Sequence, residues 1–169
     1  ASEAEIAVVK LKEAKDYLRK FYGIRQKAVC YQETDIVQGL RYLHLLALKK
    51  QKPLVMCVAL GTNLGGHNGM SSLSRILGSY SRLVDRCVVI GGGNEANERH
   101  HFQGKLNQVG EVQEVEMRVE SGNTGFVAEL WGTIPNIVTA YLISPSGERS
   151  PVISIRQGSR YQLTFPFEQ

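Results

Sequence analysis

Two short apolar runs, each closed by glycine, constrain the fold of this chain more than any other feature. The first is Pro53–Leu60, followed by Gly61, and the second is Cys87–Ile90, followed by Gly91. An apolar run of this length that stops at glycine is typical of a buried strand that leads into a loop. Because both runs are apolar almost throughout, they predict a sheet that is covered on both faces.

Helical patterns lie before and between these runs. Asp35–Lys50 carries apolar residues at helical spacing, and its first residue is expected to cap it, with Gln38 three positions on as in a capping box. Ser71 or Ser72 is placed to cap a further helix that extends to about residue 84. A strand–helix–strand order predicts parallel strands that are joined by a crossover.

The first part of the chain fits the same alternation. Ile6–Leu11 is expected to form a strand, and Glu13–Tyr22 a short helix that ends at Gly23. Together with the segments that follow, this order predicts an α/β domain over residues 1–105, with helices packed on a partial parallel sheet.

The composition changes near residue 105, and we expect a second, β-rich domain over residues 106–169. Strand-like segments recur there at short intervals: 113–120, 125–132, 137–144, 152–156 and 161–167. Turn sequences separate them, for example Ser144–Gly147. Short strands with this spacing favour an antiparallel sandwich or jelly roll.

Charge and hydropathy argue against a nucleic-acid-binding protein and against a membrane-spanning one. The formal net charge is +4, and the main basic cluster (Lys49, Lys50 and Lys52) falls at the end of an expected helix, where cations are favourable. No basic face with a recognition motif is present, so we expect no nucleic-acid partner. No apolar run is long enough for a membrane span, and the first residues do not resemble a signal peptide.

The three cysteines do not make an even disulfide framework. Cys57 and Cys87 lie inside the two apolar runs, so the sequence predicts buried free thiols. Free thiols are typical of a reducing compartment.

The loop after the second apolar run carries the main candidate site. Gly91, Gly92 and Gly93 precede Asn94, whose side-chain amide can donate a hydrogen bond into a cleft, as in an oxyanion hole. The same residues satisfy the glycine pattern of a dinucleotide-binding turn, which must open a helix. The segment that follows lacks a helical apolar stripe, so a nucleotide-binding protein is the weaker hypothesis.

Other candidate groups have simpler interpretations. His67, His100 and His101 lack the spacing of a metal site, and we expect them to be exposed or hydrogen-bonded. Ser71 and Ser72 lack the glycine pattern of a nucleophile turn and are expected to cap a helix. No Ser–His–Asp set can be assembled from these residues. We therefore expect no metal and no cofactor.

Asn94 and its preceding glycines resemble the Gly-Asn-Glu oxyanion motif of subtilisin-like serine proteases. The segment Ala1–Leu11, the helix 35–50 and the strand Met56–Gly61 are similar to family segments in the same order. The β-rich tail, with Glu129–Gly132 and Ser144–Glu148, resembles the jelly-roll insertion of the Csp-type branch, which acts in bacterial spore germination. The resemblance covers nearly the whole chain.

The resemblance implies that Asn94 supplies the oxyanion donor. It also implies that Ala59, Leu60 and Gly61 pair with substrate backbone, and that Gly91, Gly92 and Gly93 line the adjoining pocket. The catalytic Asp and His would precede Ala1 and the Ser would follow Gln169, so the chain is expected to be an inactive central fragment of an endopeptidase.

Two departures from the family pattern stand at these positions. Ala59 replaces the serine of the substrate strand, and the three glycines replace Ala-Ala-Gly. If the backbone does the binding, the first change affects little, whereas the second loosens the loop.

The family also implies partners: a protein or peptide substrate, such as a spore-cortex hydrolase zymogen, in a spore-forming bacterium. Exposed sheet edges in a fragment are expected to favour self-association. The alternative from another class is a non-catalytic scaffold, either a pseudoprotease or a binding module in germination signalling.

Overall fold

The computed structural model describes residues 3–25, 27–123, 125–154 and 160–166, which form two compact units. Unit 1 spans Ala1–Glu129 and unit 2 spans Leu130–Gln169. The units divide after Glu129, whereas the composition change lies near residue 105, and the boundary at residue 105 stays a prediction. Each unit is described by itself.

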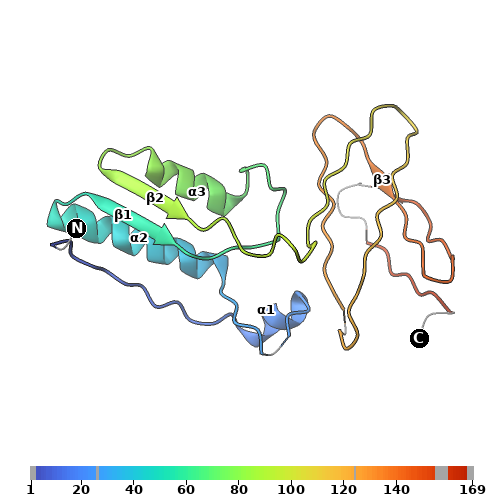
Figure 1. Cartoon of the computed structure of the whole chain (residues 1–169), viewed down its shortest axis with the longest axis horizontal. Helices are drawn as coiled ribbons and strands as arrows, with labels where there is room; N and C mark the ends of the chain where they lie inside the picture. The colour runs from blue at the N-terminus through green and yellow to red at the C-terminus, as the bar shows by residue number, and fades with distance from the viewer. Residues whose placement is uncertain (1–2, 26, 124, 155–159, 167–169) are drawn as a thin grey trace. The chain divides into compact units, whose positions relative to one another are not determined.

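Unit 1 contains a two-stranded parallel sheet with helices (Figure 1). Its helices are α1 (Asp16–Phe21), α2 (Glu33–Lys50) and α3 (Ser72–Ser81), and its strands are β1 (Leu54–Val58) and β2 (Arg86–Ile90). The strands pair in register from Leu54 opposite Arg86 to Val58 opposite Ile90. The predicted parallel pair with a helical crossover is therefore confirmed.

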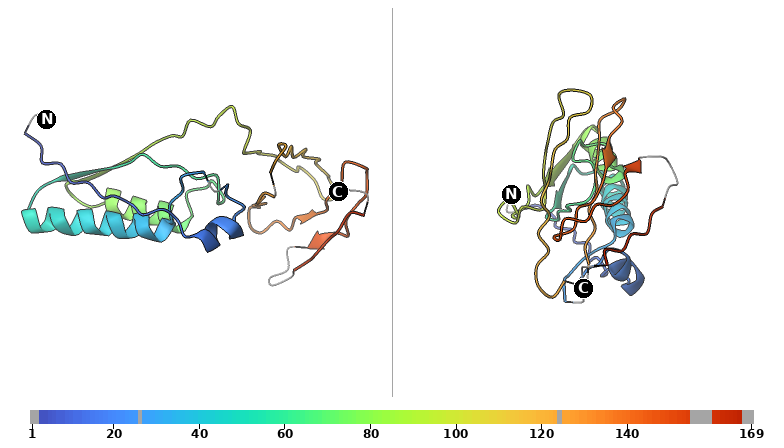
Figure 2. Two further views of the ribbon diagram at one scale, coloured as in Figure 1. Left: turned by 90° about the horizontal axis from the view of Figure 1, so that it is seen from below. Right: turned by 90° about the vertical axis from the view of Figure 1, so that its right-hand side faces the viewer.

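Helices α2 and α3 pack on one face of the sheet. Leu40 of α2, Met56 of β1 and Leu77 of α3 form the buried cluster, and Met56 is only 1% exposed. Partly buried neighbours from the same helices and strands complete it: Ile36, Leu43, Leu54, Val58, Leu73, Tyr80 and Val88. The edge-on view in Figure 2 places both helices on the same side of the strands.

The opposite face of the sheet is open, which corrects two expectations. Side chains alternate along a strand, so Val55 and Cys57 of β1 point away from Met56, as do Cys87 and Val89 of β2. Val55 is 68% exposed and both cysteines are exposed. The predicted two-sided coverage and buried thiols are wrong for the described residues, because both helices lie on the other face.

This open apolar face gives a physical basis for the expected self-association. We predict that purified chain forms concentration-dependent oligomers, and that the double variant Val55→Lys/Val89→Lys shifts them toward monomer, because charged side chains oppose burial of the face. Sedimentation velocity across a concentration series measures the effect. Val84→Lys is the matched control, since Val84 is 86% exposed in the turn before β2. A wild-type chain that stays monomeric throughout the series would contradict the prediction.

Helix α2 begins two residues earlier than predicted. Its N-cap is Gln32, which makes no side-chain capping bond, so the capping box at Asp35 and Gln38 is wrong. Asp35 lies in the first turn instead, where a carboxylate is favourable beside the helix N-terminus. The helix ends at Lys50 as predicted, and its last turn carries Lys49 and Lys50.

The N-terminal segment lies along α2 without forming the predicted strand 6–11. Glu5 pairs with Lys50 at 2.7 Å and also with Lys52, while Lys12 lies 3.8 Å from Asp35 at the other end of the helix. Lys50 and Lys52 lower the pKa of the Glu5 carboxyl from 4.5 to about 2, chiefly through the hydrogen bond from Lys50. The segment is extended but has no strand partner among the described residues, and without a partner the predicted strand does not form.

Arg19 organises the first helix, and the sequence patterns did not identify it. Its guanidinium is buried and donates to the carbonyls of Ala14 at 3.2 Å and Ala28 at 2.7 Å, and it pairs with Glu13 at 2.9 Å. A buried charge needs such partners. Arg19 therefore connects α1 by hydrogen bonds to the segment before it, at Glu13 and Ala14, and to the segment after it, at Ala28.

Unit 2 is a short antiparallel hairpin with irregular flanks. Strands β3 (Thr139–Ala140) and β4 (Ile153–Ser154) pair, and Ile143 bridges to Arg149 nearer the turn. The predicted turn at Ser144 is confirmed by the bond from Ser144 N–H to the Glu148 carbonyl at 2.9 Å.

The wider β architecture is not seen. The described residues contain no jelly roll, and those of 113–120 and 125–132 form no strand. Parts of 152–156 and 161–167 lie outside the described residues. Alternation of apolar and polar residues predicts which face a strand would bury, but a strand also requires a hydrogen-bonded neighbour.

Helix lengths bear on membrane insertion. No helix in the described ranges is both long and apolar enough to cross a bilayer.

Candidate functional site

The two glycine-closed loops meet at the carboxyl ends of β1 and β2. Gly91 N–H donates to the Val58 carbonyl at 3.1 Å and extends the strand pairing by one bond. A Cβ placed on Gly91 would lie 3.9 Å from the Cα of Ala59. The loop beginning at Ala59 and the loop beginning at Gly91 therefore start side by side, at the edge of a parallel sheet where ligands commonly bind.

The backbone turns sharply just before Asn94. Gly93 has a φ of +84°, a conformation that glycine adopts without strain and other residues rarely do. A Cβ on Gly92 or Gly93 would meet nothing within 4 Å, so this side of the loop is open. The three glycines therefore give a loop whose backbone a ligand can approach closely.

Asn94 is exposed, and its side chain makes no hydrogen bond to any described residue. A free amide at the end of a parallel strand can donate to an incoming oxygen. This geometry leaves Asn94 available for the predicted role, which itself stays a prediction.

A dinucleotide site requires a helix after the glycine turn, with its N-terminus directed at the pyrophosphate. The segment 94–106 contains only a turn, closed by a bond from Glu98 N–H to the Glu95 carbonyl at 3.0 Å. This observation argues against the nucleotide-binding hypothesis.

A polar network joins the two loops beyond the glycines, and the sequence patterns missed it. The Asn63 side-chain amide donates to the Glu95 carboxylate at 2.8 Å, and His100 Nδ1 lies 3.2 Å from the same oxygen. The bond from Asn63, followed by that from His100, lowers the pKa of the Glu95 carboxyl. Glu95 is thus held as a carboxylate directly after Asn94.

The histidines support the same connection between loops. His67 and His101 stack with ring centroids 4.5 Å apart, and His67 Nε2 lies 3.2 Å from the Asn63 carbonyl oxygen. The histidines are exposed, as expected, and no set of three His, Cys, Asp or Glu residues within the described ranges could hold a metal.

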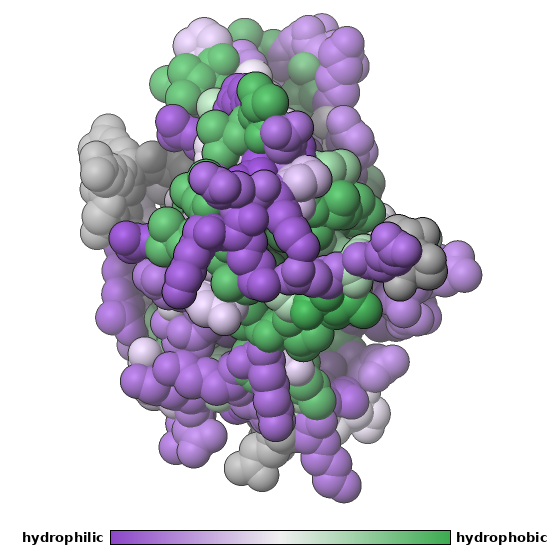
Figure 3. All heavy atoms as spheres, turned by 90° about the vertical axis from the view of Figure 1, so that its left-hand side faces the viewer, coloured by the Kyte–Doolittle hydropathy of each residue, from purple (hydrophilic) through white to green (hydrophobic). Residues whose placement is uncertain are grey.

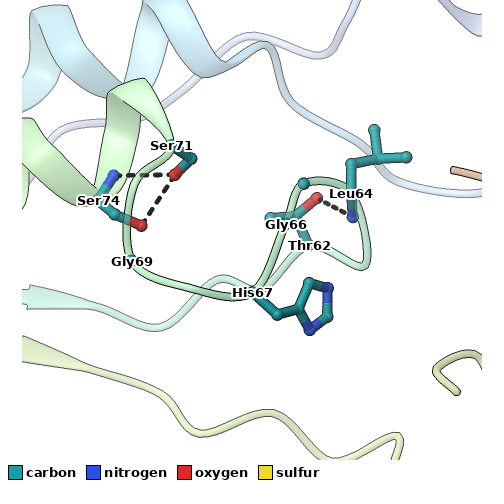
Figure 4. A pocket seen from close by; sticks show the side chains of 8 residues that line it. Thr62, Leu64, Gly66, His67, Gly69, Ser71 and Ser74 are labelled. Carbon is teal, nitrogen blue, oxygen red and sulfur yellow. Dashed lines mark hydrogen bonds between the residues drawn. The ribbon is translucent and has the colours of Figure 1, made fainter. Parts of the chain in front are cut away.

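A shallow hollow lies beside the first loop, next to the start of α3 (Figure 4). Thr62, Leu64, His67, Ser71 and Ser74 are among its lining residues, whereas the glycines of the second loop and Asn94 are not. The Ser71 hydroxyl accepts a bond from Ser74 N–H at 3.2 Å, which confirms its capping role. The hollow is therefore separate from the candidate oxyanion site.

The fold is shared with a protein of known structure. No protein-family model and no curated protein matches the sequence. Among solved structures, the chain is similar to the CspB protease of Clostridium perfringens, with a TM-score of 0.58 and 23% identity. The match covers 79% of this chain and 28% of the length of that protein, so the chain has the fold of part of the CspB protease.

Proposed function

We propose that this chain is part of a subtilisin-like serine endopeptidase of the germination branch. Asn94 would supply the oxyanion donor, while Ala59–Gly61 and Gly91–Gly93 would bind the substrate backbone. Three independent features support the proposal: the order of the sequence motifs, the meeting of their loops at one sheet edge, and the shared fold with a protease.

The observation that carries the proposal is the bond from Gly91 N–H to the Val58 carbonyl. It brings the start of the candidate substrate strand next to the glycines that precede Asn94. A peptide lying extended along Ala59–Gly61 would then pass the amide of Asn94, so that one surface both holds the substrate and stabilises developing charge.

The proposed mechanism needs groups from the rest of the enzyme. A serine would attack the peptide carbonyl, with a histidine as general base and an aspartate to orient the histidine. Within this chain, backbone groups of Ala59–Gly61 would align the peptide, and Asn94 would donate to the oxyanion. A spore-cortex hydrolase zymogen is the proposed protein substrate.

The test compares the full-length protein with residues 1–169 alone. We expect the full-length protein to hydrolyse an extended peptide anilide and to be labelled on one serine by a fluorophosphonate, while the chain alone does neither. Mass spectrometry of the labelled peptide identifies the serine, and a variant lacking that serine is the control.

A non-catalytic scaffold predicts a different outcome of the same experiment. A full-length protein that binds peptide but shows no hydrolysis and no labelled serine would be a pseudoprotease. The open glycine loop, which has no side chains to form a pocket wall at Gly92 and Gly93, is the observation that favours this second function.

A further inference from the structure

Glu95 and Asn63 link two loops that are distant in sequence. Asn63 lies in the loop after β1 and Glu95 in the loop after β2, and their 2.8 Å bond joins positions 32 residues apart. Among the described residues, the last backbone hydrogen bond between the ends of β1 and β2 is the one from Gly91 N–H to the Val58 carbonyl. Beyond that point, side chains must hold the loops together.

We infer that Glu95 and Asn63 are positioning residues that fix the separation between the candidate substrate strand and Asn94. This inference rests on the proposed function. Glu95 follows Asn94 directly, so holding its carboxylate restricts the backbone that carries the oxyanion donor. Asn63 follows Gly61 by two residues, so the same bond restricts the end of the substrate strand.

The network around Glu95 has more than one contact. Asn63 Nδ2 also lies 3.1 Å from His100 Nδ1, and His100 Nδ1 lies 3.2 Å from the Glu95 oxygen that Asn63 binds. The three side chains therefore form a triangle of contacts, in which the single Nδ1 atom either accepts from Asn63 or donates to Glu95. In both cases the triangle holds two hydrogen bonds.

A second contact lies beside the triangle. The Asn63 carbonyl oxygen is 3.2 Å from His67 Nε2, and the His67 ring stacks on His101 with an angle of 9° between the rings. His101 neighbours His100, so both contacts join the same two loops. The Asn63–Glu95 bond and the His67–His101 stack therefore both hold the first loop against the second.

Positioning has a large effect on catalysis, because a reacting group displaced by about 1 Å can cost roughly 10²-fold in rate. The Glu95 and Asn63 side chains are bonded to each other across the two loops. Their effect would therefore act through Asn94 and the substrate strand.

The experiment uses the full-length protein and two readouts. Hydrogen exchange followed by mass spectrometry reports on the loops without any need for activity. We expect Asn63→Ala to raise exchange in the second loop, residues 91–101, and Glu95→Ala to raise it in the first loop, residues 59–69. Each increase should be roughly 2- to 10-fold, the effect of losing one hydrogen bond on local opening.

Kinetics provide the second readout. Asn63→Ala and Glu95→Ala should each lower kcat about 10-fold with little change in KM, and the double variant should lose no more than either single variant. Glu95→Gln should retain most of the rate, because its amide oxygen still accepts from Asn63. Glu98→Ala is the matched control, as this exposed carboxylate lies three residues further along the same loop.

The outcomes separate the two proposals. Unchanged exchange across the opposite loop in both alanine variants would overturn the positioning role, even if the wild-type protein hydrolyses peptide. Cross-loop exchange that rises as expected, in a protein without peptidase activity, would support the link while rejecting the proposed function. The positioning role would also be overturned if the rate losses of the two single variants multiplied in the double variant.

Discussion

Replacing Asn94 by alanine in the full-length protein is expected to lower kcat about 10²–10³-fold and to leave KM almost unchanged. The size of this loss comes from the side-chain oxyanion donor of subtilisin. Such a donor acts mainly on the charge that develops in the transition state, so its removal affects the chemical step more than substrate binding. Steady-state kinetics on a peptide anilide measure both constants.

The chain offers a matched control for this variant. Asn97 is an exposed asparagine three residues further along the same loop, and Asn97→Ala should leave kcat within about twofold of the wild type. If Asn94→Ala and Asn97→Ala give the same kcat as the wild type, Asn94 is not the oxyanion donor.

The second large effect concerns stability. Met56→Ala is expected to reduce the free energy of unfolding by about 2–5 kcal/mol, because it opens a cavity between α2, α3 and the sheet. Met56 is 1% exposed and lies in the buried cluster with Leu40 and Leu77. Urea denaturation followed by far-ultraviolet circular dichroism measures the change.

Met70 provides the comparison for Met56 within the same chain. Its side chain is 66% exposed in the loop before α3, so Met70→Ala should change the unfolding free energy by less than about 0.5 kcal/mol. Equal denaturation midpoints for the two variants would show that the cluster around Met56 is not the core of unit 1. Figure 3 shows other apolar residues among polar ones on the surface, so an exposed apolar residue such as Met70 is not unusual in this chain.

The sequence predicted the parts of unit 1 whose signals are local. Helical spacing and a serine cap identified α2 and α3, and two glycine-closed apolar runs identified β1 and β2 as a parallel pair. The exact start of α2 was not predicted. Asp is a residue type that often caps helices, so Asp35 was expected at the N-cap, but the N-cap is Gln32 and Asp35 lies in the first turn. Local patterns define a helix better than they define its first residue.

The open sheet face could not be predicted in the same way. Apolar residues at Val55, Cys57, Cys87 and Val89 require cover in a stable sheet, but the sequence does not say where that cover comes from. In the described residues both helices pack on the Met56 face. The jelly-roll prediction was wrong for a related reason. Alternation of apolar and polar residues indicates which face of a strand is buried, but it does not indicate which strand pairs with it.

At the candidate site, the sequence identified groups that follow strands and missed those that connect them. Asn94 and the glycines are predicted site residues because a family motif and a strand end coincide there. The bond between Asn63 and Glu95 joins residues from different loops, which no local spacing reveals. One signal was available: both are polar residues a few positions after parallel strands, whose carboxyl ends share one edge of the sheet.

A crystal structure of the full-length protein after reaction with a peptidyl phosphonate would show whether Asn94 is the oxyanion donor. We expect a phosphonylated serine, a peptide paired with Ala59–Gly61, and Asn94 Nδ2 about 2.7–3.1 Å from the phosphonyl oxygen. If Asn94 points away in the adduct and other groups bind that oxygen, Asn94 is not the donor. If no serine reacts, the protein is not a serine endopeptidase.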